Sequence, residues 1–216
     1  FLDQAGVKYE YNLIEISSTL HDIQKQKFKQ NTNIHPRHVS FFDVQRKEDR
    51  PCFIIALEVW DNLAQDIIAF SDKGELIQGM IEVDESARPY DIPGMYNVSF
   101  EPVCDPLITN TFNAMDHVNF KWKSLRWSPR QLLNFLGYDQ SYKWQYLPTR
   151  TFAFLNKVHD HFPKAKMLIS DFDSLPDTTP GYDAPVVQTR YNGDTVSCSN
   201  ILLKKGLFDI FFPTNF

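Results

Sequence analysis

Residues 52–58 read Cys-Phe-Ile-Ile-Ala-Leu-Glu, a run of six apolar residues that ends in an acid. A run of this length without alternation is typical of a central strand of a parallel sheet, which is buried on both faces. The polar stretch before it and Asp61 and Asn62 after it bound the strand with loops. The stretch therefore predicts a buried parallel strand with Glu58 at its carboxyl end.

Similar units lie on either side of this strand. Residues 11–16 predict a short strand, and Ser17 or Ser18 can cap a helix over residues 19–30. Residues 39–44 predict a second strand, and residues 167–170 another buried one that ends at Asp171. An order of strand, helix, strand, loop and strand indicates an α/β doubly wound sheet.

The middle of the chain has a different character. Four prolines fall between residues 72 and 107, where we expect a hairpin or long loops. Helical signals follow over residues 108–135, with one helix beginning at Pro129, and again over residues 149–162. We expect Phe152, Leu155 and Val158 to share one side of that last helix. Residues 72–150 are therefore predicted to be an irregular and helical insertion.

The carboxyl-terminal part predicts more strands. Asn192-Gly193 stands between two short strand-like runs and is a strong signal for a β-hairpin. Residues 208–212 are apolar enough to form a final strand.

Composition excludes several classes of protein. The net charge is -5 and no basic stripe is present, which argues against a nucleic-acid partner. No apolar run is long enough to cross a membrane as a helix. The three cysteines are far apart and the histidine pairs have no acidic or cysteine companion at metal-ligand spacing, so we expect no metal site.

Acidic residues fall at the predicted carboxyl ends of three strands: Glu15, Glu58 and Asp171. In open α/β sheets the ligand lies outside these ends, and an acid after the second strand can accept hydrogen bonds from ribose hydroxyls. A solvated residue just beyond a strand is the alternative interpretation of each acid.

Glu58, Asp61 and Asn62 form a second cluster. A carboxylate that follows an apolar strand must be paired, hydrated or functional, so this cluster could hold a guanidinium or position a nucleophile. The alternative is that Asp61 or Asn62 caps a helix.

Asp171-Phe172-Asp173 has the form of the DxD motif that holds a metal and a sugar nucleotide in some glycosyltransferases. No other sugar-nucleotide feature accompanies it. The chain also lacks G-x-G-x-x-G and GxxxxGK[ST], so it has no glycine loop that would bind phosphate.

Several segments, in the same order, resemble the MidA-like family, which includes mitochondrial complex I assembly factor 7. Residues 11–24, YNLIEISSTLHDIQ, are similar to the family's second strand and the helix after it. Residues 53–66, FIIALEVWDNLAQD, resemble a family segment of pattern Asn-Glu-Phe-Phe-Asp-Ala-Leu-Pro, although Leu57 stands where many members have Asn. The segments SDFDSLPD, APVVQTRYNG and DIFFPTNF are similar to the carboxyl-terminal part of fungal-type members.

This resemblance implies a Rossmann-like class I methyltransferase fold, with a mostly parallel sheet, helices on both faces, and S-adenosylmethionine as cofactor. The family's first strand and its G-x-G loop should precede Phe1, so we expect residues 1–216 to be an incomplete domain whose natural N-terminus lies upstream. Mitochondrial members of the family methylate an arginine on the 49-kDa subunit of complex I and assist its assembly in the matrix.

Site roles follow from the resemblance together with the strand ends. Glu58 is predicted to contact the substrate guanidinium, with Asp61 as a helper and Asn62 beside them. Glu15 is predicted to bind the cofactor's ribose, and Asp43 the edge of its adenine. Two functions stay open: an active protein arginine methyltransferase, and a non-catalytic methyltransferase-like remnant that acts as an assembly scaffold.

Overall fold

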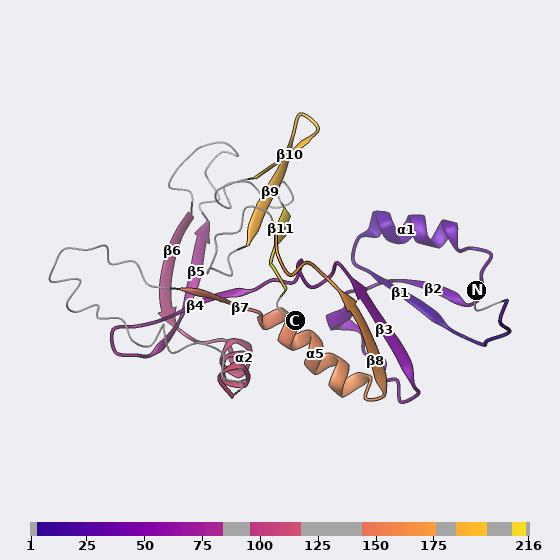
Figure 1. The fold of residues 1–216 in the computed structure, drawn as a ribbon, viewed down its shortest axis with the longest axis horizontal. Helices are drawn as coiled ribbons and strands as arrows, with labels where there is room; N and C mark the ends of the chain where they lie inside the picture. The colour runs from indigo at the N-terminus through magenta and orange to yellow at the C-terminus, as the bar shows by residue number, and fades with distance from the viewer. Residues whose placement is uncertain (1–3, 84–95, 118–143, 176–184, 198–208, 215–216) are drawn as a thin grey trace. The chain divides into compact units, whose positions relative to one another are not determined.

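The fold is known from a computed structural model of the chain. The chain divides into two compact units, each described below by itself (Figure 1). Unit 1 comprises residues 1–52 and 154–165, and unit 2 comprises residues 53–153 and 166–216. The structure describes residues 4–83, 96–117, 144–175, 185–197 and 209–214.

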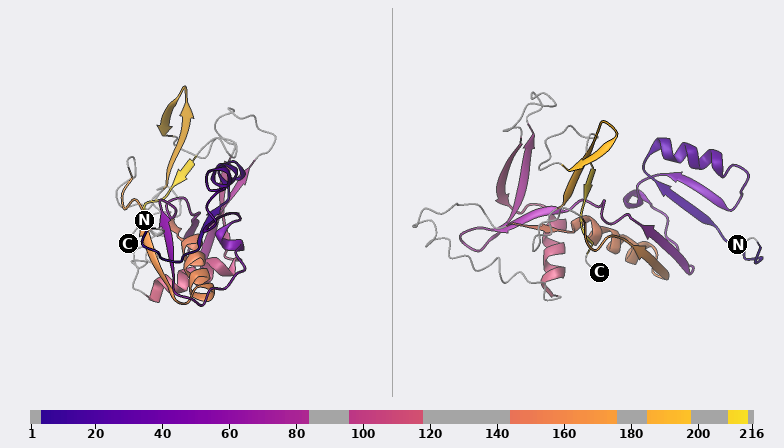
Figure 2. Two further views of the ribbon diagram at one scale, coloured as in Figure 1. Left: turned by 90° about the vertical axis from the view of Figure 1, so that its right-hand side faces the viewer. Right: turned by 45° about the horizontal axis from the view of Figure 1, so that its top comes forward.

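Unit 1 is built on a parallel pair of strands. Strand β1 (Tyr11–Glu15) pairs with β2 (Ile34–His38), and α1 (Ser18–Lys27) connects them and packs against both, as Figure 1 and the right-hand view of Figure 2 show. The Ser17 side chain accepts a hydrogen bond from the Leu20 N–H at 3.4 Å, which confirms the predicted cap. None of the α1 residues is fully buried.

The strand predicted over residues 39–44 is wrong in position. The strand that pairs with β1 lies earlier, at β2, and it includes Pro36. Residues 41–43 instead form the short 3₁₀ helix η1 (Phe41–Asp43), capped by the Ser40 hydroxyl. Phe41 packs its ring 4.2 Å from that of Phe154, so the apolar run at this point serves helix packing rather than a sheet.

Unit 2 contains the strand that the apolar run of residues 52–57 predicts. Strand β3 (Cys52–Leu57) pairs with β8 (Ala165–Ser170) in a two-stranded sheet, and the first residue of each strand belongs to unit 1. Every second residue of β3 is exposed, with Phe53 at 73% and Leu57 at 56%. Among the described residues β3 is therefore covered on one face, and the prediction of burial on both faces is wrong.

An antiparallel sheet of four strands belongs to unit 2. Two of its strands lie within residues 72–107, where the sequence predicted a hairpin or long loops. Its strand order is β6-β5-β4-β7. The strands are, in chain order, β4 (Asp66–Phe70), β5 (Leu76–Val83), β6 (Tyr96–Pro102) and β7 (Gln145–Leu147). Helix α2 (Pro106–His117) covers part of this sheet. Its core is a cluster of four buried side chains: Ile68, Ile108, Phe112 and Leu147.

A third sheet of unit 2 has the order β10-β9-β11. Strands β9 (Val186–Tyr191) and β10 (Asp194–Ser197) form the predicted hairpin, with Asn192 and Gly193 both at positive φ in the turn (Figure 1). The final strand, β11 (Asp209–Phe211), pairs antiparallel with β9.

Helix α5 (Thr149–His161) confirms the predicted helix but not its buried side. Phe154 and Val158 are buried, four residues apart, whereas Leu155 is 41% exposed. The described residues thus form a mixed α/β protein with several sheets, two of them two-stranded. The predicted helix at Pro129 lies outside the described residues. None of the helices in the described part has the length and apolarity that a membrane span requires.

Gly79 in β5 allows a test of how closely the strands of the antiparallel sheet pack. A Cβ at this position would lie 3.0 Å from both Cβ and Cγ2 of Ile67, closer than ordinary packing allows. We expect Gly79→Ala to lower the free energy of unfolding by about 1–3 kcal/mol, the usual cost of overpacking, as measured by urea denaturation. The loss should shrink in an Ile67→Ala background, and an equal loss in both backgrounds would contradict this explanation.

Candidate active site at the carboxyl ends of β3 and β8

The two strands of the β3–β8 sheet end side by side. The Glu58 N–H, one residue beyond β3, donates to the carbonyl oxygen of Ser170, the last residue of β8, at 2.8 Å. The carboxyl ends of the strands therefore lie at one edge of this sheet, where open α/β proteins bind their ligands.

Glu58 opens a tight turn at this edge. Its φ is +53°, in the left-handed region that costs a non-glycine residue roughly 1–2 kcal/mol. Its side chain is exposed and makes no hydrogen bond or ion pair with the described residues. Strained backbone of this kind is common at functional sites, and here it presents an exposed carboxylate at the end of a strand.

Asp171 holds the turn that follows Glu58. One oxygen of its carboxylate, Oδ2, accepts hydrogen bonds from the backbone N–H groups of Trp60 at 2.7 Å and of Asp61 at 3.1 Å. The other oxygen, Oδ1, accepts from the backbone N–H of Phe172 at 2.9 Å. The carboxylate thus connects the segment after β8 to the turn after β3.

Asp61 belongs to the turn itself and is 2% exposed. Its Oδ1 accepts a hydrogen bond from the Asn62 side chain at 2.6 Å, and its carbonyl oxygen accepts one from the Phe212 N–H at 2.8 Å. Burial raises the pKa of the Asp61 carboxyl, and the negative charge of Asp171 adds to this effect, whereas the hydrogen bonds from Asn62 oppose it.

The helix-cap interpretation of Asp61 and Asn62 is wrong. Residues 59–63 form turns, and the next element is the strand β4 rather than a helix. The structure instead brings the three predicted residues Glu58, Asp61 and Asn62 together in one turn, where the Asn62 amide also lies 3.5 Å from the Glu58 carbonyl oxygen.

The predicted cofactor residues lie in unit 1. Glu15 ends β1, and its Oε1 accepts a hydrogen bond from the Ser17 N–H at 2.8 Å, while Oε2 lies 3.5 Å from the Gln24 amide nitrogen. These contacts hold the carboxylate at the end of the strand and leave lone pairs on both oxygens. The half-buried Glu15 carboxylate therefore fits a pair of ribose hydroxyls.

Asp43 belongs to η1, not to the end of a strand as predicted. Its side chain is exposed and makes no hydrogen bond with the described residues. No hydrogen bond joins Glu15 to Asp43 within the described part of the chain. Their convergence on one cofactor, like the roles of Glu58, Asp61 and Asn62, stays a prediction.

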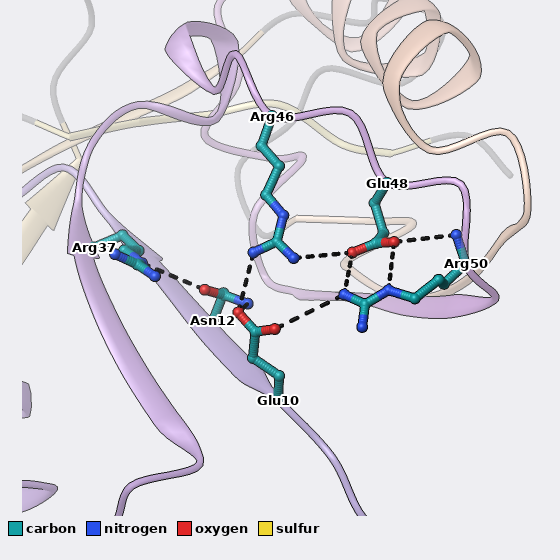
Figure 3. Close-up of polar contacts among 6 residues, drawn as sticks. All are labelled: Glu10, Asn12, Arg37, Arg46, Glu48 and Arg50. Carbon is teal, nitrogen blue, oxygen red and sulfur yellow. Dashed lines mark hydrogen bonds and ion pairs between the residues drawn. The ribbon is translucent and has the colours of Figure 1, made fainter.

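A network of charged side chains on unit 1 is the other concentration of polar contacts (Figure 3). Glu48 accepts from the guanidinium groups of Arg46 at 3.1 Å and of Arg50, whose hydrogen bonds and positive charge lower the Glu48 pKa to about 2. Glu10 pairs with Arg46 at 3.0 Å, and Asn12 accepts from Arg37 at 3.3 Å. Glu10 and Glu48 are paired with Arg46 and Arg50, whereas Arg37 contacts the neutral Asn12 amide, so the network ties segments together on the surface and carries one more positive than negative charge.

The turn after β3 and the end of β1 offer different chemical groups to a ligand. The turn after β3 carries one exposed and one buried carboxylate and suits a cationic group. The end of β1 offers a half-buried acceptor and suits hydroxyl groups. Sequence reasoning placed Asp171 at a strand end but did not anticipate that its carboxylate would bind backbone N–H groups 110 and 111 residues away.

Comparison with known proteins identifies the family to which the chain belongs. Residues 2–216 match the family described as "Putative S-adenosyl-L-methionine-dependent methyltransferase", and the chain belongs to that family. S-adenosylmethionine is accordingly its cofactor. No curated protein matches the sequence.

Proposed function

We propose that the protein is a protein arginine N-methyltransferase of the mitochondrial matrix, which modifies the 49-kDa subunit of complex I and supports assembly of the complex. The observation that carries this proposal is the exposed carboxylate of Glu58, presented by a left-handed turn at the carboxyl end of β3. The family match supports the reaction type, and the resemblance to the MidA-like family supports the substrate.

The chemistry explains why a carboxylate would be needed there. The cofactor supplies a methyl group on a sulfonium, and the enzyme contributes orientation and electrostatic support to an in-line displacement. An arginine side chain stays charged, so its nitrogen is a poor nucleophile until a carboxylate orients and polarises it. Glu58 would make this contact through paired hydrogen bonds.

Asp61 and Asn62 would support Glu58 without contacting the substrate. Because Asp61 is buried and bonded to the Asn62 side chain, it adds negative charge to the turn rather than a surface contact. The field of a buried carboxylate is less screened than that of an exposed one, so it still favours a cation above it. Glu15 would hold the ribose, and Asp43 the adenine edge.

The fold expected of such an enzyme is a Rossmann-like class I methyltransferase with one mostly parallel sheet and helices on both faces. The parallel pair β1–β2 with its connecting helix α1 supports this proposal, as does the meeting of the carboxyl ends of β3 and β8. The insertion on the substrate side, over about residues 72–150, would contain β5, β6, β7 and α2, whereas β4 of the same antiparallel sheet precedes it.

The direct test is a methylation assay with the complete protein, labelled S-adenosylmethionine and purified 49-kDa subunit. We expect label on an arginine of the subunit and none when that arginine is replaced by lysine. Label on lysine or on a small molecule instead would keep the methyltransferase class and overturn the arginine assignment.

The 216 residues contain no G-x-G loop, and the resemblance to the MidA-like family places that loop upstream of Phe1. The second function is that of a complete protein which has no such loop there: it would keep the family's fold without its reaction and act as an assembly scaffold. Copurification with complex I subunits, with no transfer of label, would favour this alternative.

The same observation predicts weak cofactor binding by the 216-residue chain alone. No glycine turn is present to let the backbone approach the cofactor's carboxylate and sulfonium, so the Glu15 carboxylate would act without that support. We expect titration calorimetry to show no binding of S-adenosylmethionine at micromolar concentrations. Micromolar affinity would mean that another backbone segment replaces the loop.

A further inference from the structure

The turn that presents Glu58 has an unusual anchor. Residues 59–62 have no helix or strand to fix them, yet two consecutive N–H groups of this turn, those of Trp60 and Asp61, point at one oxygen of Asp171. The same carboxylate is fixed at its other oxygen by the Phe172 N–H. An ionised carboxylate accepts such bonds more strongly than a neutral oxygen does.

We propose that Asp171 is a positioning residue, which holds the Glu58 turn in its left-handed geometry by accepting the backbone N–H groups of Trp60 and Asp61. Asp171 does not touch the substrate in this role; it acts through Glu58. The effect on turnover rests on the proposed function, whereas the effect on the turn does not.

The alternative use of Asp171, as half of a DxD metal site with Asp173, fits the structure less well. Both oxygens of Asp171 accept backbone N–H groups, and the two bonds to Oδ2 leave only Oδ1 with a lone pair for a cation. Asp173 bonds instead to the hydroxyl of Ser174 at 3.3 Å.

Asp171→Asn in the complete protein tests the proposal, with Asp173→Asn as its matched control. The Asn oxygen is neutral, so it accepts the Trp60 and Asp61 N–H groups more weakly than a carboxylate does, and the NH₂ group beside it cannot accept the N–H of Phe172. We expect hydrogen exchange at the Trp60 and Asp61 amides to rise at least ~10-fold in D171N and to stay unchanged in D173N.

Turnover and cofactor affinity separate positioning from general stability. We expect kcat of D171N to fall roughly 10- to 100-fold, the scale of a misplaced catalytic group, with the Kd for S-adenosylmethionine unchanged. Glu58→Gln should add little to D171N, because both changes disable the same carboxylate.

Each outcome decides one claim. Unchanged exchange at the two amides in D171N would overturn the anchor itself. Faster exchange with normal turnover, or fully additive effects of D171N and E58Q, would show that Asp171 does not act through Glu58. If the unmodified protein methylates no arginine, the proposed function fails, while the exchange measurement still tests the anchor.

Discussion

Replacing Glu58 with Gln in the complete protein is expected to lower turnover by at least ~10²-fold, the scale on which a positioned electrostatic group acts. The change keeps the side chain's size and removes its charge, so a substrate guanidinium would lose its carboxylate partner. Cofactor affinity should change little, because Glu15 and not Glu58 is assigned to the ribose. Methylation rate and the Kd for S-adenosylmethionine, measured on the same variant, check both statements.

Stability provides the internal check on this prediction. Since the Glu58 carboxylate makes no hydrogen bond with the described residues, E58Q should leave the melting temperature nearly unchanged. Glu75→Gln is a matched control, because Glu75 is also exposed and follows a tight turn, in this case before β5. Near-normal turnover of E58Q together with a lowered melting temperature would retire the catalytic assignment and favour a structural one.

The backbone at Glu58 allows a second variant. Asn adopts the left-handed conformation more readily than Glu does, so Glu58→Asn should keep the turn while shortening the side chain. A protein of unchanged stability that has lost turnover would show that the carboxylate, and not the turn, is what the reaction requires.

The largest effect on stability is expected from Leu147→Ala. Leu147 is 0% exposed and packs with Ile68, Ile108 and Phe112 between the antiparallel sheet and α2. Removing its isobutyl group leaves a cavity in this cluster, so we expect the free energy of unfolding to fall by about 2–5 kcal/mol. Urea denaturation followed by tryptophan fluorescence is a suitable measurement.

Leu155→Ala is the matched control for this core variant. The same atoms are removed from a leucine that is 41% exposed on α5, so the loss should stay within about 0.5 kcal/mol of zero. Equal losses at the two positions would contradict the placement of the core around Leu147.

Local signals predicted the elements best. The apolar run of residues 52–57, the serine before α1 and the Asn192-Gly193 turn each act over a few residues, and the strand, the cap and the hairpin that they predict are confirmed, although β3 is covered on one face only. The grouping of Glu58, Asp61 and Asn62 in one turn was also readable, because the three residues lie within five positions of one another.

The sequence did not predict which distant segments pair with one another. The sequence at β2 contains Pro36 and two histidines, and it is a strand because its backbone pairs with β1 rather than because of its own apolar pattern. Residues 41–43 looked more strand-like, yet the Phe41 ring is used to pack against Phe154, more than one hundred positions away.

By itself the sequence determined the class of the protein, the type and order of most elements, and the acids at the ends of the strands. The tertiary structure alone decided which face of β3 is covered, that Asp61 is buried, and that Asp171 holds the turn of Glu58. Propensities, caps and turn residues act through atoms that are close together along the chain, so the sequence shows them directly. Burial, and the N–H groups from which a carboxylate accepts hydrogen bonds, depend on distant segments that only folding brings together.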